Sequence, residues 1–307
     1  MADIKLFQIT PTHVTELSGQ SVALEKSLQT LIERHLDSLL GVRFLASEYS
    51  TGKNHGGRID TLGLDENNFP VIIEYKRTLN ENVINQGLFY LNWLLDHKAE
   101  FELMVLRRFG PTVADQIEWS NPRLLCIAGD FTRYDEHAVQ QINRTVELIR
   151  YRRYGDSLLL LEMVNTVTQE QPVVGQTTNA SPASGAKSSY KTVSEFLESA
   201  PTALQDLFYE LEAFITALGD DVQKKVLKFY FAYKRIKNFV CVEVHPQSQN
   251  LLVFVKVNPD EIALEEGFTR DVRSIGHFGT GDLEIRVRSR ADLEKAKPLI
   301  AASYEKS

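Results

Sequence analysis

The stretch GRIDTLGLDENNFPVIIEYK, residues 57–76, decides the fold of the N-terminal half of this chain. Apolar residues dominate on both sides of the polar segment 65–69, which predicts two adjacent strands joined by a short turn. Asp60 lies on the first strand, and Glu74 and Lys76 lie on the second. Because strand side chains alternate between faces, Glu74 and Lys76 point to one side and Tyr75 points to the other.

The charged residues of this hairpin indicate a metal site. Strands that are otherwise apolar seldom carry charges toward a core unless those charges pair or bind a metal. If the hairpin brings Asp60 beside Glu74, two carboxylates and the Lys76 ammonium converge on one spot. Hard oxygen ligands in that arrangement suit Mg²⁺ or Mn²⁺. The alternative is a surface salt bridge on an exposed hairpin.

The same hairpin resembles the PD-(D/E)XK nuclease superfamily, and within it the NucS-like branch of structure- or mismatch-directed DNA endonucleases. The resemblance rests on GRIDTLGLD at 57–65 and VIIEYKR at 71–77. An upstream apolar helix beginning near Glu25 and a downstream helix with Gln86 and Tyr90 complete it. The similarity covers roughly residues 20–165, about half of the chain.

This resemblance implies a role for each site residue. Asp60 and Glu74 would bind the divalent metal, and Lys76 would orient or polarise the attacking water. Glu25 would be an additional metal ligand or water holder, although a first-turn Glu also complements the helix dipole. Gln86 would orient the water or a phosphate oxygen, or else be a capping or packing residue.

Four further residues are candidates for contacting nucleic acid. Arg58 shares a face with Asp60 and can hold a phosphate or pair with a carboxylate. Arg77 faces away from Lys76, at the groove edge or in solvent. Lys53 lies in the loop before the hairpin, and Tyr90 lies one helical turn after Gln86. The predicted nucleic-acid contacts are therefore Arg58, Arg77, Tyr90 and Lys53.

The N-terminal half, residues 1–165, is expected to be a mixed sheet flanked by helices, an α/β (α+β) fold of the restriction-endonuclease-like type. The expected helices are 22–40, with Ser21 as N-cap and Gly41 at its end, then 82–96, 98–108 and 137–149. The expected strands are 42–50, the hairpin, 123–128 and 157–164. A flexible loop is expected at 51–57.

Residues 166–190 are rich in Ser, Thr, Gly, Pro and Gln, which predicts a flexible linker. Residues 191–307 are expected to form a smaller α+β domain with helices at 193–199, 203–218 and 291–304. Its expected strands are 239–245, 251–257 and 283–287. This half resembles a small domain of uncharacterised function that often follows nuclease-like domains.

Two basic-aromatic clusters were weighed as nucleic-acid surfaces. Residues 150–154 (RYRRY) can grip a backbone and stack a base, or can simply alternate on an exposed strand. The lysine-rich run 224–237 is interpreted as a solvated face rather than an auxiliary surface. The glycine-rich GHFGTG at 276–281 lacks the order of a dinucleotide site or a P-loop, so a tight turn is expected.

The composition is consistent with a cytoplasmic, two-domain, DNA-cleaving enzyme. The net charge of −7 argues against a constitutive nonspecific coat on nucleic acid. Two cysteines in different halves disfavour a disulfide framework, and no apolar run approaches a membrane span. The predicted function is a Mg²⁺-dependent endonuclease acting on DNA, with a homodimer implied by the resemblance. The alternatives are a catalytically inactive nucleic-acid- or protein-binding scaffold and a transport-related accessory protein.

Overall fold

The structure is a computed structural model that describes residues 4–20, 25–76, 83–167 and 191–307. The chain divides into two compact units, Met1–Val174 and Gly175–Ser307. Each unit is a mixed arrangement of helices and strands around its own apolar core. This confirms the predicted α+β class. The linker predicted at 166–190 lies almost entirely outside the described residues.

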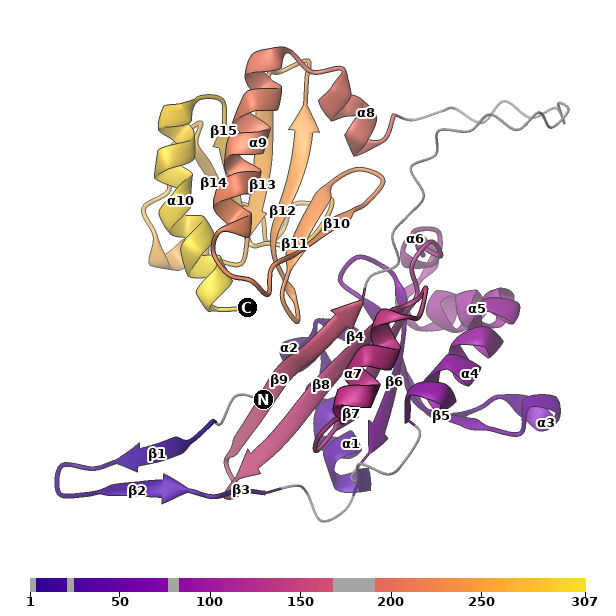
Figure 1. Cartoon of the computed structure of the whole chain (residues 1–307). Coiled ribbons are helices and arrows are strands. Elements are labelled where there is room, and N and C mark those ends of the chain that lie inside the picture. The colour runs from indigo at the N-terminus through magenta and orange to yellow at the C-terminus, as the bar shows by residue number, and fades with distance from the viewer. Residues whose placement is uncertain (1–3, 21–24, 77–82, 168–190) are drawn as a thin grey trace, which may run out of the picture. The chain divides into compact units, whose positions relative to one another are not determined.

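The first unit is built on a seven-stranded mixed sheet with the order β3-β8-β7-β6-β5-β4, in which β9 also pairs with β8 (Figure 1). The strands β4 to β7 pair antiparallel, antiparallel and then parallel, and β7 pairs parallel with β8. The strands are β3 (Gly19–Gln20), β4 (Val42–Ser50), β5 (Arg58–Asp65), β6 (Pro70–Lys76), β7 (Arg123–Ala128), β8 (Thr145–Tyr154) and β9 (Leu158–Val167).

Helices cover both faces of this sheet. The apolar residues of α4 (Val83–Asp96), α5 (Lys98–Phe109) and α7 (Arg133–Gln140) share one core with Leu62, Ile72 and Leu124 of the strands. On the opposite face, α1 (Glu25–Arg34) and α2 (Leu36–Leu40) bury their own apolar residues. The remaining helices are short: α3 (Gly52–His55) and α6 (Pro111–Ala114).

The predicted hairpin is confirmed as β5 and β6, with Asp65 accepting backbone hydrogen bonds through the turn. The helix expected at 22–40 is divided at His35 into α1 and α2. Gly41 ends it in the left-handed conformation, with φ of +62°, as its position predicts. Ser21, the expected N-cap, lies outside the described residues.

Three further differences from the sequence prediction concern this unit. The loop expected at 51–57 contains the single helical turn α3. The helix expected at 137–149 is wrong in its second half, because α7 ends at Gln140 and the strand β8 begins at Thr145. Two N-terminal strands, β1 (Leu6–Ile9) and β2 (Val14–Leu17), form a hairpin that the sequence reading did not predict (Figure 1).

The second unit is a six-stranded antiparallel sheet with the order β10-β11-β12-β13-β15-β14. Its strands are β10 (Gln223–Val226), β11 (Phe231–Lys234), β12 (Asn238–His245), β13 (Asn250–Val255), β14 (Thr269–Asp271) and β15 (Leu283–Val287). The helices α8 (Val193–Glu198), α9 (Thr202–Thr216) and α10 (Arg290–Glu305) contribute to one core with the sheet, and a 3₁₀ turn, η1, spans Pro259–Glu261.

The glycine-rich segment 276–281 forms the turn before β15, as predicted. Gly279 has φ of +82°, and a side chain there would begin 2.7 Å from the Cys241 Sγ. Glycine is therefore required at this position, both for the backbone conformation and for the close approach to β12.

Candidate active site

Asp60 and Glu74 lie side by side across the β5–β6 pair. Thr61 is opposite Ile73, and this register brings Asp60 opposite Glu74. The Asp60 backbone N–H donates to the Glu74 Oε1 at 3.2 Å, and the Tyr75 N–H donates to the Asp60 Oδ2 at 3.0 Å. Glu74 is fully buried and Asp60 is half-buried. The convergence of the two carboxylates expected from the sequence is therefore present.

The carboxylates of Asp60 and Glu74 affect the pKa values of neighbouring side chains. Burial raises the pKa of the Tyr75 hydroxyl, and the nearby carboxylates of Glu33, Asp60 and Glu74 raise it further. Burial, followed by the charge of Glu74, likewise raises the pKa of the Cys126 thiol on β7. Both groups therefore stay neutral at physiological pH.

The donor set fits Mg²⁺ or Mn²⁺. Carboxylate oxygens are the ligands that these hard cations prefer, and Mg²⁺ is commonly held by one or two carboxylates plus waters and substrate phosphates. Among the residues that the structure describes, no group of three or more His, Cys, Asp and Glu side chains could hold a metal. Asp60 and Glu74 are the two described carboxylates that would hold the ion, with water or substrate adding to its coordination.

The other predicted residues of the metal site are placed only in part. Lys76 is the last residue of β6 and is half-buried, two residues after Glu74 on the same strand face. Glu25 is the first residue of α1, but its side chain is outside what the structure describes. Arg77 lies outside the described residues. The proposed roles of these three residues remain predictions.

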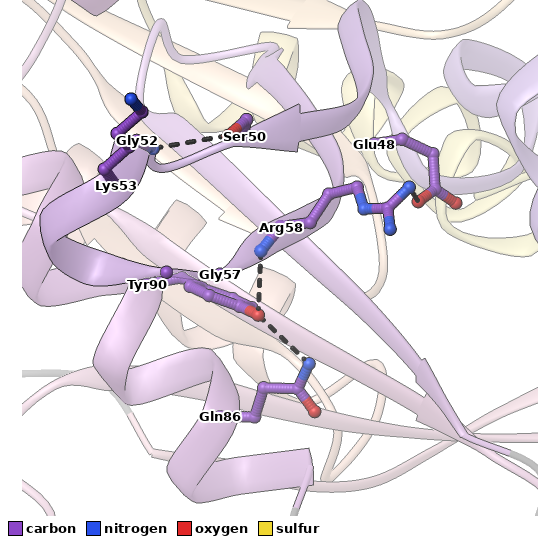
Figure 2. A pocket seen from close by; sticks show the side chains of 9 residues that line it. Glu48, Ser50, Gly52, Lys53, Gly57, Arg58, Gln86 and Tyr90 are labelled. Atoms are coloured by element: carbon purple, nitrogen blue, oxygen red, sulfur yellow. Dashed lines mark hydrogen bonds and ion pairs between the residues drawn. The ribbon is translucent and has the colours of Figure 1, made fainter.

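A pocket of about 780 Å³ adjoins the hairpin (Figure 2). Its lining includes Gln86 and Tyr90 of α4, Arg58 at the start of β5, and Lys53 of α3. The Gln86 Nε2 donates to the Tyr90 hydroxyl at 3.2 Å, and that hydroxyl accepts from the Arg58 backbone N–H at 3.1 Å. Thus α4 holds the backbone that leads into Asp60, and the Arg58 side chain remains 66% exposed.

Hydrogen bonds between its two ends hold the segment between β4 and β5 together. The Thr51 Oγ1 donates to the Gly57 carbonyl and accepts from its N–H, both at 3.0 Å. Gly57 lies against Tyr90, so that a Cβ at Gly57 would be 2.5 Å from the tyrosine ring. His55 contacts the Phe89 ring, with centroids 4.9 Å apart. These contacts fix α3, so Lys53 is carried by an ordered turn rather than a free loop.

The sequence reading missed a polar network on the opposite face of the hairpin. Gln29 of α1, which is 3% exposed, donates to the Asp60 carbonyl at 2.8 Å and to Glu33 at 3.0 Å. Glu33 in turn accepts from the Thr61 hydroxyl at 2.6 Å. Gln29 lies one helical turn after Glu25, and this spacing on an amphipathic helix was the available signal.

A chain of ion pairs at the mouth of the pocket was also missed. Glu48 of β4 accepts from the Lys26 Nζ at 2.6 Å and lies 3.4 Å from the Arg58 Nη1 (Figure 2). Ser47 is opposite Thr61 and Tyr49 is opposite Ile59, so Glu48 is opposite Asp60. A register drawn for the predicted strand 42–50 would have placed it there.

The cluster at 150–154 does not form a base-stacking surface. Tyr151 and Tyr154 are buried, and the guanidinium of Arg150 is held by Asp130 at 2.7 Å and Glu162 at 2.8 Å. β8 runs between β7 and β9, and most of its side chains are buried. Arg152 and Arg153 alone of this cluster are half-exposed.

The basic run 224–237 is not a uniformly solvated face either. Lys224 pairs with Glu212 at 2.5 Å, and its Nζ lies 4.6 Å from the centroid of the Phe231 ring. Phe231 and Tyr233 belong to the core of the second unit. The preference for a solvated face is therefore wrong for Phe231 and Tyr233, because β11 places them in the core.

Comparison with known proteins adds the following findings. Residues 193–307 match a family described as a domain of unknown function (DUF5655). The chain is 29% identical over 304 residues to an uncharacterized protein of Haemophilus influenzae, with 97% of this chain and 98% of that protein covered.

Two solved structures match the chain at low similarity. One is a repair endonuclease from Pyrococcus abyssi, with 16% identity and a TM-score of 0.29 over 43% of this chain and 49% of that chain. The other is described as an EndoMS–dsDNA2 complex, with 18% identity and a TM-score of 0.25 over 43% and 47%. The chain thus spans about half the length of these solved structures. No helix of the described residues has the length and apolarity needed to cross a membrane.

Proposed function

We propose that the N-terminal unit is a metal-dependent endonuclease that hydrolyses phosphodiester bonds in DNA. The observation that carries this proposal is the meeting of the Asp60 and Glu74 carboxylates across β5 and β6, where Glu74 accepts from the Asp60 backbone N–H and Asp60 accepts from the Tyr75 backbone N–H. The sequence resemblance to PD-(D/E)XK nucleases supports the same assignment. Both point to a hydrolase rather than to an inactive scaffold, because the acidic pair and the lysine are all retained.

The residues divide the work as follows. Asp60 and Glu74 would hold Mg²⁺ or Mn²⁺, which supplies charge stabilisation to the scissile phosphate when bound. Lys76, on the strand face of Glu74, is a cationic donor that would orient the attacking water and stabilise negative charge. Gln86 is already positioned by Tyr90 and would offer its amide to water or to a phosphate oxygen.

DNA is proposed as the substrate on the strength of the resemblance and of the pocket lining. Arg58 and Lys53 are exposed cations beside the pocket, so they can hold the backbone on either side of the scissile bond. The biological setting would be repair, restriction or defence. The second unit would bind substrate or a partner, or would mediate the homodimer that the resemblance implies.

The test is a cleavage assay with the purified full-length chain, Mg²⁺ or Mn²⁺, and labelled plain, branched, mismatched and modified DNAs. The Asp60→Asn and Lys76→Ala variants are assayed beside it, with EDTA as the metal-free control. We expect cleavage that needs metal and falls at least a hundredfold in either variant, the range found when one catalytic group is removed. Cleavage that survives in both variants would show that the activity arises elsewhere.

A further inference from the structure

Glu48 is held by two cations at the mouth of the pocket. Its Oε1 accepts from the Lys26 Nζ at 2.6 Å, and its Oε2 lies 3.4 Å from the Arg58 Nη1. The side chains of Lys26 and Arg58 are 61% and 66% exposed, whereas that of Glu48 is 34% exposed. Two solvent-facing cations therefore enclose one anion, and the three groups together carry a net positive charge.

The backbone of Glu48 is strained. Its φ of +52° lies in the left-handed region, although it is a non-glycine residue within β4. Its neighbours Ser47 and Tyr49 pair regularly with β5, so the sheet is continuous on both sides of it. Such a conformation costs free energy and is found where it serves a site rather than the fold. Here it lets a residue of the edge strand reach Lys26 on α1.

The ion pairs keep Glu48 charged. The hydrogen bond from Lys26 is the largest influence and lowers the pKa of this carboxyl. Burial is the next largest and raises it, and the charges of Lys26 and Arg58 lower it further. An ionised carboxylate and a phosphate oxygen are both acceptors for ammonium and guanidinium groups. The same two cations can therefore accept either group.

We propose that Lys26 and Arg58 form a subsite for a backbone phosphate of DNA, and that the Glu48 carboxylate occupies this subsite until DNA displaces it. The proposal rests on the proposed function, because Glu48 lies opposite Asp60 in the sheet. Neighbouring strands are about 4.8 Å apart, so the subsite lies next to the metal-binding pair. It would take a phosphate adjacent to the scissile one, and Glu48 would act as a built-in competitor.

A polymer backbone fits the site better than a free phosphate. Lys53 lines the same pocket, which is open and about 780 Å³ in volume, so a third exposed cation lies along the path away from the subsite. Successive phosphates of one strand can contact such a row of cations together, whereas a single free phosphate cannot.

The test measures binding of the full-length chain to fluorescein-labelled DNA by anisotropy, in EDTA so that no cleavage intervenes. Glu48→Gln removes the competing charge and keeps the side-chain size. Glu16→Gln is the matched control, because Glu16 forms an ion pair with Lys5 at 3.5 Å on the separate β1–β2 hairpin. The double variant Glu48→Gln with Arg58→Gln removes the cation to which the gain is attributed.

We expect Glu48→Gln to tighten DNA binding about three- to tenfold, because DNA no longer has to displace a carboxylate from the two cations. Glu16→Gln should change the Kd less than twofold, and the double variant should lose the gain. Equal effects of Glu48→Gln and Glu16→Gln would overturn the proposal, as would a gain that persists without Arg58. Competition by inorganic phosphate at the same concentration of phosphate groups as the DNA would overturn the assignment to a polymer.

This experiment separates the two proposals. If Glu48→Gln tightens binding as expected but no DNA is cleaved with any metal, the subsite stands and the endonuclease proposal fails. If DNA is cleaved but Glu48→Gln binds like the unsubstituted chain, the endonuclease proposal stands and the subsite fails. Absence of any DNA binding in both proteins would refute the subsite.

Discussion

Replacing Arg123 with methionine is expected to destabilise the first unit by about 3–5 kcal/mol, the usual cost of removing one partner from a buried ion pair. The Arg123 guanidinium is 4% exposed and donates at 2.7–2.8 Å to Asp65 and to both oxygens of Glu147. Asp65 would keep its hydrogen bonds from the backbone of Asn67 and Phe69. The loss of folding stability therefore arises mainly from Glu147, whose carboxylate is fully buried.

The assay is urea unfolding followed by tryptophan fluorescence. The chain has two tryptophans, Trp93 and Trp119, and both lie in the first unit, so the signal reports that unit alone. Arg153→Met is the control on β8, because Arg153 is 37% exposed and lies 3.7 Å from a fully exposed Asp156. An exposed pair of this kind contributes about 0–1 kcal/mol.

Two further measurements test the reasoning. The double variant Arg123→Met with Glu147→Met replaces the charges with apolar groups and should recover most of the loss. In Arg123→Met alone, the loss should shrink as the pH falls, because protonation of Glu147 removes the buried charge and the folded state then binds the extra proton. A loss below about 1 kcal/mol, or an equal loss in the double variant, would refute the account.

Three other outcomes follow from the site. Glu74→Gln should abolish the rise in unfolding temperature that Mn²⁺ gives the unsubstituted chain, measured by scanning fluorimetry; an undiminished rise would place the metal elsewhere. Gly57→Ala should cost about 1–3 kcal/mol in urea unfolding, because its Cβ would be 2.5 Å from the Tyr90 ring; no loss would mean that the tyrosine moves freely. Burial and the hydrogen bond to Glu100 raise the pKa of Tyr49 to about 12, above its ordinary 10, so the stability it contributes is present below pH 10 and lost as the pH rises through 12. The free energy of unfolding of Tyr49→Phe should therefore fall less steeply between pH 10 and 12 than that of the unsubstituted chain. Identical pH profiles of the two proteins would contradict this.

The sequence predicted those elements whose pattern is local. The strand 123–128 is an apolar run after Arg123, the strand 42–50 follows directly after Gly41, and the structure has both with the predicted bounds. The hairpin placed Asp60 and Glu74 together because a short turn fixes its register. The pairing of Asp60 with Glu74 could thus be predicted, because it depends on a single hairpin.

Elements that depend on distant partners were not predictable in this way. The helix expected at 137–149 fitted a helical period, but residues 145–154 pair with β7 on one side and β9 on the other, and this pairing decides their conformation. The edge strand β10, QKKV, has no apolar pattern of its own and forms by pairing with β11. Glu48 lies on a correctly predicted strand, yet nothing in its local sequence indicates a left-handed backbone.

The two ends of strand β5 show why one carboxylate cluster suits a metal and the other does not. Asp65, at one end, forms an ion pair with the Arg123 Nη1 at 2.7 Å, so the chain itself supplies its cation. At the other end Asp60 and Glu74 each lie two residues from the terminus of their strand, and the groups given to them across the pair are backbone N–H donors. A backbone dipole offsets only part of a full charge, and the carboxylates add to the effect of burial in raising the pKa values of Tyr75 and Cys126. The arrangement at this end of the strand is the one that we propose for a divalent cation.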